Sequence, residues 1–181
     1  MIWDSGPWRD ELLKSATKLE QMAVRRKPSS KLIVELEKAV FFAAYIVRKL
    51  MEARLLSSEY PPITARAYPA KGKPATLWNW HHIDDLYDLA GPMDKTITLR
   101  ELCNQLVHCY VFMPLTSSKT GPVKAVVFTS DHNRNNALYE VSLATISNVL
   151  RTVARDYPSH SEWKLNSKTR DYQVRNWTPA Q

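Results

Sequence analysis

The sequence predicts one mainly α domain with some β structure: a helical bundle with a long central helix and a small antiparallel hairpin or sheet near the C-terminus. The central helix is indicated over residues 30–56, where apolar side chains recur on most sides of a helix, as in a buried one. Two β-rich segments, residues 123–131 and 136–143, flank a run of Asn and Asp and indicate a hairpin. The order of elements lacks a βαβ alternation, which argues against a parallel sheet.

Two helices are predicted at the start of the chain, over residues 7–25 and 30–56. Pro7 suits the first turn of the earlier helix, and Pro28 stops it. The last turn of that helix carries three cations, which the negative end of the helix dipole favours: Arg25, Arg26 and Lys27. Helix electrostatics therefore explain this triplet before any appeal to nucleic acid.

The middle of the chain is predicted to alternate between connections and short helices. Residues 57–76 are rich in proline and form a long connection, with the stretch "ITARAY" as a candidate short strand. A short helix is expected over residues 78–89. Thr98 and Glu101 match a capping box, so the next helix is placed at residues 99–109.

The last third of the chain completes the expected domain, which spans residues 1–157. The hairpin covers residues 123–143, residues 110–113 are a candidate third strand, and a final helix follows over residues 143–156. Residues 158–181 are polar apart from a few aromatic residues, so we expect an extended or disordered tail.

Composition narrows the classes of function. Only four glycines occur, which argues against a dinucleotide-binding fingerprint, and the chain lacks a P-loop pattern. The longest apolar run, residues 39–47, is too short to cross a membrane, and the first residues do not resemble a signal peptide, so a cytoplasmic protein is expected. Cys103 and Cys109 are expected to be reduced, and no metal or cofactor is expected.

The charge balance leaves two interpretations open. The formal net charge is +7 and the isoelectric point about 9.4, which suits a protein that neutralises phosphates. The same charge also suits a soluble protein that has no nucleic-acid partner.

A polar stripe on the helix at residues 99–109 is the main candidate site. Arg100, Asn104 and His108 recur at intervals of four residues and share one helix face. A structural interpretation is also available, because the arginine can pair with a nearby carboxylate and the histidine can cap the helix end.

The stretch "CNQLVH" resembles the signature of HEPN domains (higher eukaryotes and prokaryotes nucleotide-binding), over roughly residues 7–110. The resemblance implies a helical bundle, often a homodimer, and in many members a metal-independent ribonuclease with an Arg, a polar residue and a His. Asn104 and His108 match two of these positions, with the histidine as general base. Cys103 stands where the arginine is expected, and Arg100 lies one turn earlier.

Members of that superfamily that lack the catalytic pair act as binding or scaffold modules. The sequence therefore predicts a non-catalytic module for nucleic acid or a protein partner, expected as a homodimer. Two alternatives stay open at this point. One is a metal-independent endoribonuclease of a toxin–antitoxin or phage-defence system. The other is a structural subunit of a larger complex.

Two further polar clusters are candidate binding sites. His81 and His82 lie beside several aspartates in "NWHHIDDLYD", at a spacing that a metal site permits but that a solvated helix face explains better. His132 and Arg134 lie in "SDHNRNN", where Asn and Asp are typical of a hairpin turn that could also contact a partner.

Overall fold

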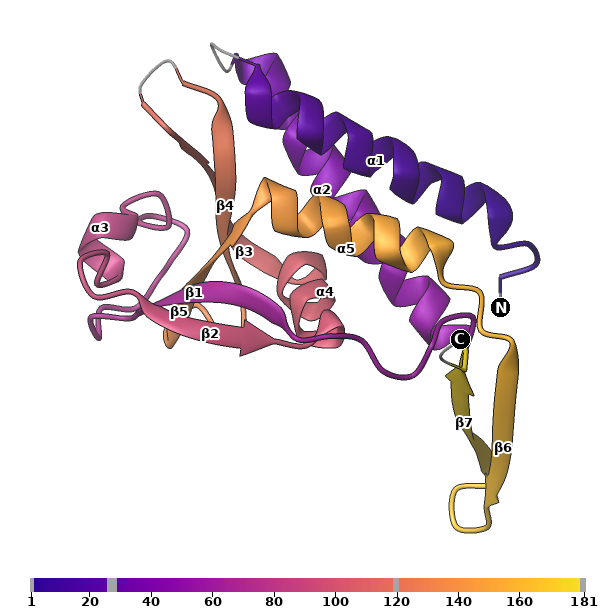
Figure 1. Cartoon of the computed structure of the whole chain (residues 1–181). Coiled ribbons are helices and arrows are strands. Elements are labelled where there is room, and N and C mark those ends of the chain that lie inside the picture. The colour runs from indigo at the N-terminus through magenta and orange to yellow at the C-terminus, as the bar shows by residue number, and fades with distance from the viewer. Residues whose placement is uncertain (1, 26–28, 119–120, 180–181) are drawn as a thin grey trace.

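The computed structural model describes residues 2–25, 29–118 and 121–179 and places helices and strands in an α+β order (Figure 1). Arg26, Lys27 and Pro28, which the sequence places at the end of the first helix, lie outside the described residues. The elements in chain order are α1 Gly6–Val24, α2 Ser30–Glu52, β1 Ile63–Pro69, α3 Ile83–Leu86, β2 Met93–Ile97, α4 Leu99–Val107, β3 Cys109–Thr116, β4 Val123–Ser130, β5 Ala137–Ser142, α5 Leu143–Arg155, β6 His160–Asn166 and β7 Asp171–Trp177.

The centre of the fold is a five-stranded sheet in the order β2-β1-β5-β4-β3, in which each neighbouring pair is antiparallel. The long helices α1, α2 and α5 lie on one side of this sheet (Figure 1). A separate two-stranded sheet, β6-β7, projects from the body, and α3 lies at the opposite end of the molecule (Figure 1).

The prediction of a helical bundle with a small sheet is wrong. Of the described residues, 39% are helical and 29% lie in strands, with a five-stranded antiparallel sheet and an additional hairpin. The error arose in segments that sequence reasoning assigned mainly to connections. β1 alternates buried and exposed positions from Ile63 to Ala67, but two of its buried residues are alanines, Ala65 and Ala67, and β2 buries Ile97 alone. Neither strand therefore shows a sustained alternation of large β-branched or aromatic residues with polar ones, which is the pattern that indicates a strand in a sequence.

Several element boundaries also differ from the predicted ones. The helix expected over residues 78–89 is reduced to the single turn α3, and α4 ends at Val107 because β3 begins at Cys109. The capping box of Thr98 and Glu101 is present, with both of its hydrogen bonds. Where the sequence predicts an extended or disordered tail over residues 158–181, residues 160–177 form a hairpin in which β6 and β7 pair along their whole length.

Two apolar clusters hold the fold together, one on each face of the sheet. The larger fills the space between the sheet and the helices, and Leu36, Leu50 and Phe128 are among its fully buried members. The smaller cluster lies on the other face, where the segment around α3 covers part of the sheet. Its buried members are Tyr68, Ala75, Leu86, Tyr87, Val111, Val127 and Leu138.

Within the described ranges, no helix combines the length and apolar character needed to cross a membrane. In the same ranges, no group of three or more His, Cys, Asp or Glu side chains is placed to hold a metal ion.

Candidate functional site

The polar stripe on α4 is tied to the neighbouring helix. Arg48 on α2 donates a hydrogen bond through Nη1 to the side-chain oxygen of Asn104, and its Nε pairs with Glu52 at 2.9 Å. Arg100 and His108 are both exposed. His108 is the residue that caps α4, with its backbone N–H bonded to the carbonyl oxygen of Asn104 at 3.1 Å. The amide of Asn104 therefore serves helix packing, and the ribonuclease role of the stripe stays a prediction.

Cys103 stands at the position where the HEPN motif has its arginine, and it belongs to the core. Its side chain is only 2% exposed, and burial raises the pKa of its thiol to about 12. Burial likewise raises the pKa of the Cys109 thiol to about 12. Both thiols are therefore protonated near neutral pH and unsuited to nucleophilic or metal-binding roles.

The structure brings the other two predicted clusters together at one end of the sheet. The rings of His81 and His82 are exposed, with their centroids 4.1 Å apart. Arg134 lies over the ring of Tyr110 at 4.1 Å, and its carbonyl oxygen accepts a hydrogen bond of 2.7 Å from the Tyr87 hydroxyl. These contacts attach the β4–β5 turn to the segment around α3. They are explained by packing, so we assign no site there.

The feature that sequence reasoning missed is the hairpin of β6 and β7, residues 160–177, which we call the arm. Facing residues of the two strands share a face, so the register of pairing separates the side chains of the arm into two sets. One face is largely apolar: Trp163, Leu165, Tyr172 and Val174. The other is largely polar: His160, Glu162, Lys164, Gln173, Arg175 and Trp177. The signal was present in the alternation of "HSEWKLN" and "DYQVRNW", but the turn between them lacks a glycine.

The apolar face of the arm is far more exposed than such side chains usually are. Trp163 is 60% exposed, Leu165 58% and Tyr172 50%. The rings of Trp163 and Tyr172 meet edge to face, with centroids 5.8 Å apart. Contiguous exposed apolar surface of this kind marks an interaction site more often than a passive surface.

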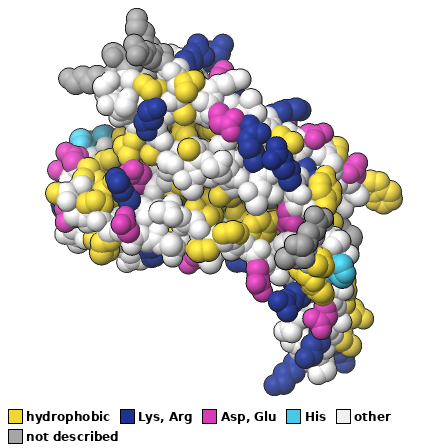
Figure 2. Space-filling view, in the orientation of Figure 1, with side chains coloured by type: hydrophobic (Ala, Val, Ile, Leu, Met, Phe, Trp, Pro, Cys, Tyr) yellow, Lys and Arg dark blue, Asp and Glu magenta, His cyan; other side chains and the backbone are white. Residues whose placement is uncertain are grey.

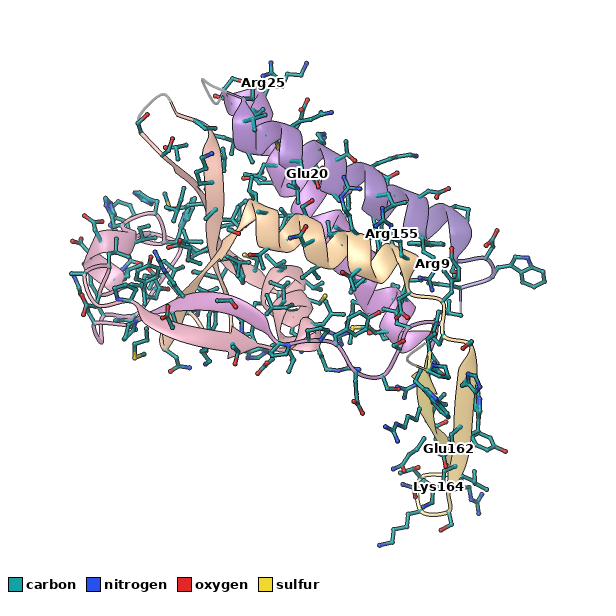
Figure 3. All side chains as sticks on the ribbon, viewed as in Figure 1. Arg9, Glu20, Arg25, Arg155, Glu162 and Lys164 are labelled. Atoms are coloured by element: carbon teal, nitrogen blue, oxygen red, sulfur yellow. The ribbon has the colours of Figure 1, made fainter. Side chains whose placement is uncertain are left out.

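The polar face and the turn of the arm carry an excess of cations. The whole arm holds Lys164, Lys168, Arg170 and Arg175 against the carboxylates of Glu162 and Asp171. Hydrophobic side chains gather along one side of the arm and Lys or Arg along the other (Figure 2), and Glu162 and Lys164 mark β6 in Figure 3. His160 stacks on Trp177 with centroids 5.6 Å apart and an interplanar angle of 28°.

Asn176 fixes the arm to the body. Its side chain is 7% exposed, and its Nδ2 donates to the carbonyl oxygens of Arg54 at 2.7 Å and Leu56 at 3.2 Å. Its backbone N–H donates to the Ser58 hydroxyl at 2.9 Å, and the Ser58 N–H donates to its carbonyl oxygen at 2.9 Å. One asparagine thus anchors the root of the arm just beyond the end of α2.

A cleft of about 700 Å³ lies between the apolar face of the arm and the ends of α1 and α2. Its volume falls in the range of about 300–1,000 Å³ that is typical of ligand sites. Glu52 in this cleft is held in ion pairs with Arg48 and Lys49, at 2.9 and 2.8 Å. The lining residues are Ile2, Trp8, Tyr45, Lys49, Glu52, Ala53, Arg54, Trp163, Asp171, Tyr172 and Val174.

Comparison of the chain with known protein families, curated proteins and solved structures gives no match. The arm and its cleft are therefore interpreted from their own geometry and chemistry. The resemblance to HEPN domains and the homodimer stay predictions.

Proposed function

We propose that this chain is a non-catalytic nucleic-acid-binding module whose arm contacts the phosphate backbone. The observation that carries the proposal is the combination, on one projecting β-ribbon, of four cations against two carboxylates with three exposed aromatic rings. Cations supply most of the affinity for a phosphate backbone, and aromatic rings add stacking with bases.

The shape and charge of the molecule support the proposal. Seven residues per strand give a ribbon roughly 23 Å long, which allows contacts to several successive phosphates. The net charge of +7 attracts a polyanion before contact is made. A two-stranded hairpin alone is marginally stable in water, so an arm with both faces exposed gains stability from a bound partner.

The test is fluorescence anisotropy of labelled oligonucleotides over a series of salt concentrations. The arm variant combines Lys164→Ala, Lys168→Ala and Arg170→Ala. The matched control removes three exposed cations far from the arm in sequence, one at the C-terminal end of α1 and two on α2: Arg25→Ala, Lys31→Ala and Lys38→Ala. Both variants lose the same charge, so only their position differs.

We expect the arm variant to bind more weakly and to reduce the slope of log affinity against log salt by about 2, since each phosphate contact to a single strand contributes about 0.7. The control is expected to keep the wild-type slope. The proposal is overturned if the wild type binds no oligonucleotide at low salt, or if the two variants lose affinity and slope equally.

A metal-independent ribonuclease is the second candidate, and the contact between Arg48 and Asn104 favours it. That contact places the Arg48 guanidinium beside the motif asparagine, Asn104. It could replace the motif arginine, whose position is occupied by Cys103. An arginine there could stabilise charge on a phosphate while His108 acts as base. If purified wild type leaves RNA intact, or if His108→Ala cleaves RNA equally well, this candidate fails.

A further inference from the structure

We infer that the cleft between the arm and the ends of α1 and α2 receives the unpaired bases of a single-stranded nucleic acid. The inference rests on the proposed function and names the substrate class of the same site. It predicts that the single strand is preferred over the duplex.

The first support is the chemistry of the cleft walls. Four aromatic rings from four different elements line it: Trp8 from α1, Tyr45 from α2, Trp163 from β6 and Tyr172 from β7. All four are exposed, from 37% for Trp8 to 60% for Trp163. Every base has a π-face, so such rings bind unpaired bases with little regard to sequence.

The second support is that the walls carry cations as well as rings: Lys49 and Arg54, beside the carboxylates of Glu52 and Asp171. Lys49 lies 5.6 Å from the centre of the Tyr45 ring and pairs with Glu52. Arg54 is exposed and lies in the left-handed region with φ of 60°, which is uncommon for a residue other than glycine. Among residues 2–25, 29–118 and 121–179, Arg54 forms no ion pair with an acidic side chain. Its guanidinium is available for a phosphate between the stacked bases.

The third support is geometric. The bases of a duplex are already stacked on one another, and only a single strand can place their faces against protein rings. The cleft opens between the body and the apolar face of the arm, while Lys164 and Arg175 lie on the opposite face. A single strand can therefore enter with its bases toward the rings and its phosphates toward the cations of Arg54 and the turn of the arm.

An apolar segment of a protein partner is the competing occupant. The observations favour nucleic acid because, among the described residues that line the cleft, the four aromatic ones are larger and more numerous than the aliphatic ones, which are Ile2, Ala53 and Val174. Aromatic rings beside cations are typical of single-strand binding sites. The protein partner is an outcome of the test below.

The experiment compares labelled oligo-dT with a duplex of equal length, using the full chain, by anisotropy and by quenching of tryptophan fluorescence. Trp163→Ala removes one cleft ring, and Trp78→Ala is the matched control, because Trp78 is 89% exposed in the segment that precedes α3. Tyr45→Ala is the second cleft variant. It lies on α2, so it leaves the strands of the arm intact.

We expect the wild type to bind oligo-dT more tightly than the duplex. Each cleft variant is expected to weaken oligo-dT binding by about 5- to 150-fold, the loss of one stacked base, with the salt slope and the duplex affinity unchanged. Trp78→Ala is expected to bind like the wild type.

Equal binding of oligo-dT and duplex overturns the inference, as does wild-type affinity in both cleft variants. If either result occurs while the arm's cation variant still loses its salt slope, the proposed function stands and only the inference fails. If neither oligonucleotide binds, both fail, and a protein partner becomes the explanation of the cleft.

Discussion

Arg9 donates a hydrogen bond of 2.7 Å through Nη2 to the carbonyl oxygen of Leu55, which joins the start of α1 to the chain beyond α2. Its Nη1 donates to the carbonyl oxygen of Val153 at 3.0 Å and to that of Asp156. The guanidinium lies 4.1 Å from the centre of the Tyr157 ring, beside the end of α5 (Figure 3). At 2% exposure, this cation donates to carbonyl groups at the C-terminal end of α5 and just beyond the end of α2.

Replacing Arg9 with methionine is expected to destabilise the protein by about 3–5 kcal/mol, because buried carbonyl oxygens then lose their donors. The stability of Arg9→Lys is expected to fall between those of the wild type and Arg9→Met, since an ammonium keeps the charge but cannot span three carbonyls. Urea unfolding measures the free energies, with Arg25→Ala as an exposed control. A change within about 0.5 kcal/mol for Arg9→Met would contradict this role.

Glu20 makes stability depend on pH through Arg151. The carboxylate accepts hydrogen bonds from Arg151 Nη2 at 2.6 Å and from Ser147 Oγ at 2.6 Å, and these lower its pKa from 4.5 to about 2. The unfolded chain therefore takes up the proton first as pH falls. The stabilisation by Glu20 is complete above pH 4.5 and fades toward pH 2.

Glu20→Gln is expected to lower the urea midpoint at neutral pH. The difference in urea midpoint between Glu20→Gln and the wild type is expected to shrink as pH falls from about 4.5 toward about 2. A difference that stayed constant from neutral pH down to about 2 would show that Glu20 acts through something other than its charge.

Asn176→Ala is expected to loosen the arm while leaving the body folded. The substitution removes the side-chain bonds to the carbonyl oxygens of Arg54 and Leu56, while the two backbone bonds between this position and Ser58 remain. Hydrogen exchange should speed up at the amides of β6 and β7 and stay unchanged in β4 and β5. Oligonucleotide binding should weaken in parallel. Unaltered exchange in the arm would show that another contact anchors it.

Asn104→Ala tests whether the stripe on α4 is structural. Losing the hydrogen bond from Arg48 is expected to cost about 1–2 kcal/mol of stability, because the donor is charged. Oligonucleotide affinity should not change, since the arm and its cleft do not involve Asn104. A loss of affinity without a loss of stability would instead assign Asn104 to a binding site.

Part of this structure follows from local signals in the sequence. Thr98 and Glu101 place the start of α4 because a capping box needs only neighbouring residues. The apolar spacing of α2 and α5 and the Asn-rich turn between β4 and β5 act over equally short distances. Such elements can be predicted because their causes lie within a few turns or a few residues of chain.

What only the tertiary structure decided depends on partners far away in the chain. β1 becomes an inner strand of the sheet because Arg66 to Pro69 pair with β5, some 70 residues later, although two of its buried positions are alanines. The arm lies at the end of α2 because Asn176 donates hydrogen bonds to carbonyl groups beyond that helix, and the side-chain oxygen of Asn104 is hydrogen-bonded because Arg48 lies across from it. The sequence by itself determined most of the helices and the hairpin of β4 and β5. Long-range contacts decided the strand order of the sheet, the position of the arm against the body and therefore the cleft, since no local pattern encodes which distant groups meet.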